Sequence, residues 1–454
     1  MSVLVRERRF YRSFFSLTGM IAVQNLLTFS VNLADNLMLG AYSETALAGS
    51  ALVNQIQFLL QMVVMGVGEG IVVLASQYWG KRDVSSIRRV QNIGMRIAVG
   101  AALVLWALVF FFPRGCLGLL TNEQPVIEEA AKYLQIICFS YVFFAMTNIL
   151  LATLRSVETV KISFAVSGST LLINCCLNTL LIFGTFGAPR LGIRGAAIAT
   201  LVSRIVEFLI MVLYTAFSDK KLHARLKDFG RMDGLLFRDY LRVGLPVILS
   251  NTMWGLAQAI QTSILGHMGQ ATIAANSIAT TIFQIISVVT YGAASASSVI
   301  VGKTIGENRL DDVKAYAKTL QVLYLGIGVG TGLLLFLAKD FILGFYSIAA
   351  DTRALASLFI TVLSVTVVGT SYQVAVLTGI VRGAGDTSFV LVNDFIFMWL
   401  IVLPSAALAA FVFHLPPPVV FICLKSDQIL KCFVAVVKVN FFPWIRRLTR
   451  TTEE

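Results

Sequence analysis

The sequence predicts an all-α polytopic membrane protein built from two helical bundles. Its 454 residues are 57% hydrophobic and only 13% charged, with a mean hydropathy of +0.82. A soluble domain has about 25% charged residues. Apolar runs of about 20 residues recur along the whole chain, and each is long enough to cross a bilayer as a helix. The two halves of the chain also resemble each other, which predicts one bundle for each half.

Twelve segments have the length and apolar character of a membrane span. Glycine and proline residues mark several of their ends, as at Pro113, Pro189 and Pro416. The predicted spans are 14–40, 47–76, 91–112, 132–154, 162–186, 191–217, 240–266, 273–302, 316–338, 354–381, 388–413 and 418–442.

The distribution of basic residues predicts the orientation of these spans. The tails and the loops on one side carry 25 lysine and arginine residues, whereas the opposite loops carry 6. Because basic loops stay in the cytoplasm, we expect a multi-pass membrane protein with both termini in the cytoplasm. The net charge of +12 therefore reflects topology and does not indicate nucleic-acid binding.

The two halves of the chain form a repeat. A shift of 226 residues places "LMLGAYSETALAGSAL" (37–52) over "SILGHMGQATIAANSI" (263–278), and a shift of 227 places Arg155 over Arg382. We predict a six-helix lobe over 1–217, a polar cytoplasmic linker over 218–239, and a second six-helix lobe with a short basic tail over 240–454. Six spans per lobe give both lobes the same orientation, related by a pseudo-two-fold axis along the membrane normal. Parallel repeats of this kind are a transporter architecture.

The stretch "SVNLADNLMLG" (30–40) places a carboxylate, Asp35, inside an apolar span. Desolvation of a charged residue within a span is energetically unfavourable, so Asp35 indicates a functional site or a set of polar partners. Helical rise brings Asn174, Asn178 and Thr200 to a similar depth in the first bundle. Such a cluster can bind a proton or a hard cation such as Na⁺. The alternative is a structural polar cluster that holds helices together.

Two other charged groups lie within the first bundle. Arg204 and Glu207 are three residues apart on one helix and are expected to form an ion pair. Glu69, among close-packing glycines, has two interpretations. It either lines an inner cavity that attracts cations or pairs with a basic residue such as Arg96.

The second bundle also has charged residues within its predicted spans 11 and 12. Asp394 is interpreted as an interfacial polar residue near a span end. Asp427 and Lys431 are four residues apart and can pair on their helix. Lys425 has no obvious partner on that helix and is expected to face the interior of the second bundle, where a gating contact is one interpretation.

The stretches "VNLADNLMLGAYSETALAGSALVNQI", "LASQYWGKRD", "NCCLNTLLIFGTFGAPRLGIRGAAIATLVSR" and "LTGIVRGAGDT" resemble the multidrug and toxic compound extrusion (MATE) family. The resemblance covers nearly the whole chain, including the span count and the two-lobe repeat. It implies an antiporter that exports cationic or amphipathic compounds in exchange for H⁺ or Na⁺. Such proteins alternate between inward- and outward-facing V shapes, and they are often monomeric.

The resemblance also assigns the ion-coupling residues. The sequence is similar to the DinF-like branch of the family, in which an aspartate of the N-terminal lobe responds to the coupling ion. That aspartate matches Asp35. The partners match Asn174 and Thr200, but Asn178 stands where the family pattern has a second aspartate. The branch that couples through the C-terminal lobe has acidic residues on spans 7 and 10, and this sequence has none in those spans. With one carboxylate in the cluster, H⁺ is favoured over Na⁺ at Asp35.

Glutamine, methionine and aromatic side chains recur at helical spacing on spans 2, 7 and 8. Such side chains suit a promiscuous amphipathic substrate cavity, although they are more often ordinary helix contacts. The candidate cavity residues are Gln55, Phe58, Gln61, Met62, Met65 and Glu69 on span 2, Trp254, Gln258 and Gln261 on span 7, and Phe283 on span 8.

Three other classes of protein compete with an antiporter. A flippase for lipid-linked or other amphipathic lipids stays within the same superfamily, but such proteins use cationic cavities. An integral-membrane enzyme is disfavoured because the sequence has no metal motif, nucleophile elbow or phosphate loop. The repeat argues against a structural or receptor protein. We therefore expect no catalytic residue, no cofactor and no metal beyond a coupling Na⁺.

Overall fold

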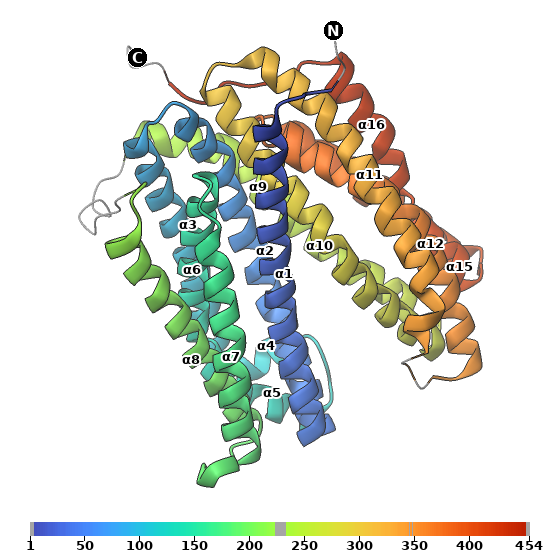
Figure 1. Cartoon of the computed structure of the whole chain (residues 1–454). Coiled ribbons are helices and arrows are strands. Elements are labelled where there is room, and N and C mark those ends of the chain that lie inside the picture. The colour runs from blue at the N-terminus through green and yellow to red at the C-terminus, as the bar shows by residue number, and fades with distance from the viewer. Residues whose placement is uncertain (1–3, 223–232, 345, 347, 451–454) are drawn as a thin grey trace. The chain divides into compact units, whose positions relative to one another are not determined.

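The computed structural model describes residues 4–222, 233–344, 346 and 348–450. Helices dominate this part of the chain, and their contacts divide it into two compact units (Figure 1). The N-terminal unit comprises Val23–Ile248, and the C-terminal unit comprises Met1–Ala22 with Leu249–Glu454. Within the predicted linker at 218–239, residues 223–232 lie outside the described part, and α9 begins at Gly234.

The N-terminal unit surrounds α2 (Glu44–Gly80), whose middle is buried between its neighbours. α2 contacts α3 (Val84–Phe111), α5 (Gln124–Ile137) and α6 (Ser140–Ser156), as Figure 1 shows. α7 (Lys161–Phe183) pairs with α8 (Ile193–Leu213), and the short α4 (Pro113–Gly118) packs on α5. Asp83 starts α3 as its N-cap by accepting a hydrogen bond from the Ser86 N–H.

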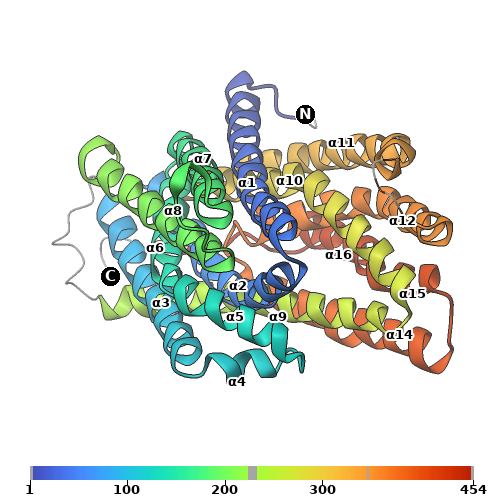
Figure 2. The ribbon, with the colours of Figure 1, turned by 90° about the horizontal axis from the view of Figure 1, so that it is seen from below.

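The C-terminal unit is arranged around α10 (Gln270–Gly306) and α12 (Ala350–Val374). α11 (Leu310–Leu343) lies beside α12 (Figure 2). π-helical turns interrupt the later helices. η4 (Ala375–Val381) continues α12, and η5 (Phe395–Val402), α14 (Leu403–Ala407) and η6 (Leu408–Val412) continue α13 (Thr387–Asp394). α15 (Pro417–Lys425) and α16 (Asp427–Phe441) end the unit, and the stacked rings of Phe359 and Phe421 lie 4.1 Å apart in its core.

Two long helices each contribute to both units. α1 (Arg8–Tyr42) has 35 residues, or about 50 Å at 1.5 Å per residue, which exceeds the hydrocarbon thickness of a bilayer. Its residues up to Ala22 are grouped with the C-terminal unit and the remainder with the N-terminal unit. α9 (Gly234–Gly266) changes unit in the opposite sense after Ile248, close to its internal Pro246. The units therefore divide the chain at other positions than the lobe boundaries drawn at 217 and 240.

The predicted spans are recovered as helices, with two differences in continuity. Ten described helices are long and apolar enough to cross a membrane, or eleven if the pair α5 and α6, bent by 54°, is counted as one span. The predicted span over 132–154 falls on this pair, whose helix breaks between Ile137 and Ser140. The predicted twelfth span is divided at Ser426 into α15 and α16, where Lys425 and Asp427 flank the break.

α7 and α8 approach closely because glycine stands at their contact. A Cβ atom added to Gly195 of α8 would overlap the carbonyl group of Leu181 on α7. Gly168, which is also on α7, has no such neighbour within 4 Å. The absence of a side chain at residue 195 thus sets the spacing of these two helices.

We expect Gly195→Ala to destabilise the protein and Gly168→Ala to leave it unchanged or slightly more stable. Overpacking of this kind costs about 1–3 kcal/mol, whereas alanine at an open helical position gains helix propensity. Thermal unfolding of the purified protein in detergent measures both. Equal unfolding temperatures for the two variants would contradict the close contact at Gly195.

Candidate functional site

The polar cluster predicted in the first bundle exists, and α1, α7 and α8 build it. Asp35 is 9% exposed, Asn174 and Asn178 are fully buried, and Thr200 is 7% exposed. Asn174 and Asn178 are four residues apart, so they lie one above the other on the same face of α7. The close approach of α7 and α8 places Thr200 next to them.

The four side chains form a closed ring of hydrogen bonds. The Asn178 amide donates to Oδ1 of Asp35 and, over 3.1 Å, to Oδ1 of Asn174. The Asn174 amide donates to the Thr200 hydroxyl over 3.2 Å, and that hydroxyl donates to Oδ2 of Asp35 over 3.4 Å. Every bond to Asp35 in this ring is donated to it, so the arrangement suits an ionised carboxylate, which only accepts.

The ring is satisfied except at one atom. Oδ1 of Asn178 is buried and has no hydrogen-bond partner among the described residues. Tyr133 of α5 is buried beside the ring, with its phenol near Thr200. Sequence reasoning did not single out Tyr133, because a tyrosine in an apolar span carries no distinctive local signal.

The two other acidic groups predicted within the first bundle, Glu69 and Glu207, each lie in an ion pair. Arg204 and Glu207 are 2.7 Å apart, as predicted, with side chains 12% and 6% exposed. The Arg204 guanidinium also lies over the ring of Phe144. Glu69 lies 3.6 Å from Arg155 on α6. The structure thus brings Glu69 close to an arginine that sequence reasoning had not proposed as its partner.

The candidate cavity residues of α2 share one helix face but differ in exposure. Gln55 and Met65 are exposed, Phe58, Gln61 and Glu69 are half-buried, and Met62 is buried. The Met62 side chain could therefore line a substrate cavity only if the residues around it moved.

The candidate cavity residues of α9 and α10 lie in the C-terminal unit. Trp254 is 38% exposed, Gln258 is half-buried, and Phe283 packs against the core. Gln261 is buried and donates to the sulfur of Met398 over 3.2 Å.

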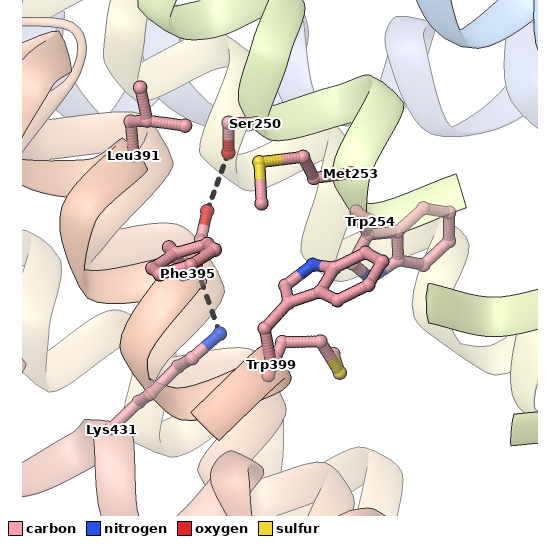
Figure 3. Close-up of a pocket in the computed structure, with 9 residues that line it drawn as sticks. Ser250, Met253, Trp254, Leu391, Phe395, Trp399 and Lys431 are labelled. Atoms are coloured by element: carbon pink, nitrogen blue, oxygen red, sulfur yellow. Dashed lines mark hydrogen bonds and ion pairs between the residues drawn. The ribbon is translucent and has the colours of Figure 1, made fainter. Parts of the chain in front are cut away.

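A second polar cluster lies in the C-terminal unit, around Asp394 (Figure 3). Asp394 accepts a hydrogen bond from Ser250 over 2.6 Å and pairs with Lys431 over 2.9 Å. Lys431 is also 3.5 Å from Asp427, so the pair predicted from their spacing is confirmed. Asp394, predicted to be an interfacial polar residue, connects α13 to α9 and α16. Sequence reasoning missed this because Ser250, Asp394 and Lys431 are far apart in the chain.

The remaining cation of this region also has a defined environment. The ammonium group of Lys425 lies over the ring of Phe421, 5.6 Å from its centre. Within the described ranges, no group of three or more histidine, cysteine, aspartate and glutamate side chains is arranged to hold a metal ion.

A buried carboxylate within a long apolar helix is typical of a functional site in a membrane protein. The family model MatE matches residues 21–180 and 246–408. The chain belongs to this family, whose members are multi-pass membrane transporters rather than enzymes.

Curated relatives resemble the chain over most of its length. The uncharacterized transporter YisQ of Bacillus subtilis is 27% identical over 400 residues, which are 87% of each chain. The probable multidrug resistance protein NorM of Thermotoga maritima is 26% identical over 438 residues, covering 95% of this chain and 92% of the relative.

Solved structures share the fold. The eukaryotic MATE transporter AtDTX14 superposes with a TM-score of 0.85 over 96% of each chain at 19% identity. A MATE structure in the bent conformation superposes with a TM-score of 0.85 over 94% of each chain at 17% identity. The predicted fold class, a twelve-helix MATE fold of two bundles, is confirmed at this level.

We expect Glu207→Gln to destabilise the protein strongly because it leaves the buried Arg204 guanidinium without its carboxylate. Removing one partner of a buried pair costs about 3–5 kcal/mol, and replacing both by apolar residues restores much of this. The double variant Arg204→Met with Glu207→Leu should therefore unfold at a higher temperature than Glu207→Gln in detergent.

The matched control is Glu128→Gln. Glu128 pairs with Arg114 over 3.1 Å, but these side chains are 49% and 73% exposed, so the loss should stay within about 1 kcal/mol. If Glu207→Gln lowered the unfolding temperature no more than Glu128→Gln does, the ion pair between Arg204 and Glu207 would not contribute to stability.

Proposed function

We propose that this protein is a secondary antiporter that exports cationic or amphipathic organic compounds in exchange for H⁺. The observation that carries the proposal is the closed ring of hydrogen bonds around Asp35, which holds one carboxylate inside a membrane span. The similarity to multidrug resistance proteins supports the class of cargo.

The ring supplies a mechanism for coupling. Ionised Asp35 accepts bonds from Asn178 and Thr200 and thereby holds α1 against α7 and α8. A proton on Asp35 turns one acceptor into a donor, and the ring then contains more donors than its present arrangement accepts. The unpartnered Oδ1 of Asn178 is a buried acceptor that can take the new bond once the amide turns. The change shifts the preferred position of α1, which biases alternation between inward- and outward-facing states.

The composition of the ring favours H⁺ over Na⁺ as the coupling ion. Asn178 stands where a second carboxylate would strengthen a sodium site, so the ring offers a single negative charge. Na⁺ at Asp35 remains the second candidate, since amide and hydroxyl oxygens are ligands for a hard cation.

Cargo binding is proposed at the methionine, glutamine and aromatic side chains of α2, α9 and α10. Flexible methionine and flat aromatic surfaces accommodate cargo of varied shape. The excess of basic residues in one set of loops supports a bacterial inner-membrane protein with both termini in the cytoplasm. We also propose that the protein acts as a monomer without a cofactor, as members of this family often do. The comparisons do not favour the flippase alternative.

We expect Asp35→Asn to abolish ion-coupled transport. Ethidium movement is measured in inverted vesicles under an imposed pH gradient and then under an imposed Na⁺ gradient. The side-chain amide of asparagine does not take up a proton at physiological pH, so the rate of coupled transport should fall by about tenfold or more. In the wild type, the pH gradient should drive transport.

Asp311→Asn is the control, because this exposed aspartate in the first turn of α11 lies outside both polar clusters. Its coupled transport should match that of the wild type. If Asp35→Asn kept full coupled transport, Asp35 would be a structural group, and Glu69 and the charged face of α16 would become the next candidates.

A further inference from the structure

The polar cluster of the C-terminal unit occupies the same place in the repeat as the ring around Asp35. The ring joins predicted spans 1, 5 and 6, and the Asp394 cluster joins spans 7, 11 and 12. The shift of 227 residues that aligns Arg155 with Arg382 places Thr200 on Asp427 and Arg204 on Lys431. The charged groups themselves differ, because the second cluster contains a lysine between two carboxylates.

We propose that Asp394 is a second proton-binding site. While Asp394 is ionised, Lys431 balances its charge. When Asp394 binds a proton, Lys431 pairs with Asp427 instead. The role of this site in transport rests on the antiport proposed above, whereas proton binding at Asp394 does not.

The size of the site selects the ligand. A cavity of about 10 Å³ lies against Ser250, Trp254, Asp394, Trp399 and Lys431. A void of this volume holds about one water molecule, so an organic cation does not fit. The Lys431 ammonium already occupies the position that a metal cation would take beside Asp394. A proton delivered by water is the ligand that both facts allow.

The two carboxylates differ in their access to that proton. The Asp394 side chain is 30% exposed and borders the cavity, whereas the Asp427 side chain is 8% exposed. A proton from water binds to a carboxylate oxygen of Asp394 and makes it a neutral carboxyl. Lys431 keeps its charge, and its second carboxylate, Asp427, is already 3.5 Å away on the same helix. No buried charge is left without a partner by the exchange.

The exchange has a structural consequence. Ionised Asp394 links α9 through Ser250 and α16 through Lys431 to the end of α13. Once Asp394 is protonated, the charge–charge attraction to Lys431 is lost, and only a hydrogen bond from the Lys431 ammonium to an oxygen of the neutral carboxyl can remain. The contact between α13 and α16 therefore loosens, while Lys431 and Asp427 remain paired within α16.

Other titratable groups face this cluster and must be separated from Asp394. Tyr291 of α10 lies within electrostatic range of Asp427 and Lys431. Lys425 of α15 and the Cys432 thiol of α16 lie within electrostatic range of Asp427. His267 lines an apolar groove of about 510 Å³ that shares Trp399 with the small cavity. None of these groups bonds directly to Asp394 in the described contacts.

The test uses tryptophan emission as a reporter, since Trp254 and Trp399 border the cavity. Purified full-length Asp35→Asn protein is titrated from about pH 3 to pH 8, so that the first ring does not contribute. We expect a one-proton transition in emission, which Trp399→Phe reduces. Asp394→Asn, added to Asp35→Asn, should abolish the transition, and Asp394→Glu should restore it.

Two matched controls assign the transition. Asp427→Asn removes the carboxylate that takes over Lys431 but keeps Asp394, so the transition should persist and move to lower pH. His267→Gln removes the titratable imidazole of the adjoining groove lining and should leave the transition unchanged. The proposal would be overturned if the Asp35→Asn protein showed no transition, if the transition persisted after Asp394→Asn, or if His267→Gln abolished it.

The titration separates this inference from the proposed function. If wild-type vesicles failed to move ethidium under any gradient but the Asp394-dependent transition remained, the cargo proposal would fail and the proton site would stand. If coupled transport depended on Asp35 and no Asp394-dependent transition existed, the antiport proposal would stand and the second site would fail.

Discussion

A carboxylate inside a membrane span is the constraint on which this structure depends. Its desolvation is unfavourable unless donors replace water. Around Asp35 the replacement comes from two other helices, through Asn178 of α7 and Thr200 of α8. The carboxylate therefore sets the arrangement of three helices, and that arrangement requires the close contact that Gly195 permits between α7 and α8. A change in one proton alters the balance of donors and acceptors for all of them.

The same principle is used differently in the C-terminal unit. There the donors to Asp394 are a serine of α9 and a lysine of α16, so a full positive charge replaces the neutral amide. The helices that carry these clusters, α1 and α9, each contribute residues to both compact units. Asp35 lies on the first of these helices, and Asp394 contacts the second through Ser250.

The sequence was sufficient for the fold class and for much of the first site. Hydropathy and the repeat predicted two bundles of spanning helices, and helical rise placed Asn174, Asn178 and Thr200 at the depth of Asp35. Local patterns could not predict the break between Ile137 and Ser140, because both sides of it are apolar. They also missed the Asp394 cluster, whose members are up to 181 residues apart and meet only after α9, α13 and α16 pack. Charges on one helix, such as Asp427 and Lys431, were predictable because helical spacing alone brings them together.

The most direct test of this account is the protonation of Asp35 itself, observed by infrared difference spectroscopy. The purified protein is acidified, and the carboxylate and protonated-carboxyl bands of the wild type are compared with those of Asp35→Asn. The account predicts a protonated-carboxyl band in the wild type that disappears in Asp35→Asn, together with amide changes from the asparagines of the ring. Identical difference spectra for the two proteins would contradict it, since Asp35 would then keep one protonation state and could not couple an ion to movement.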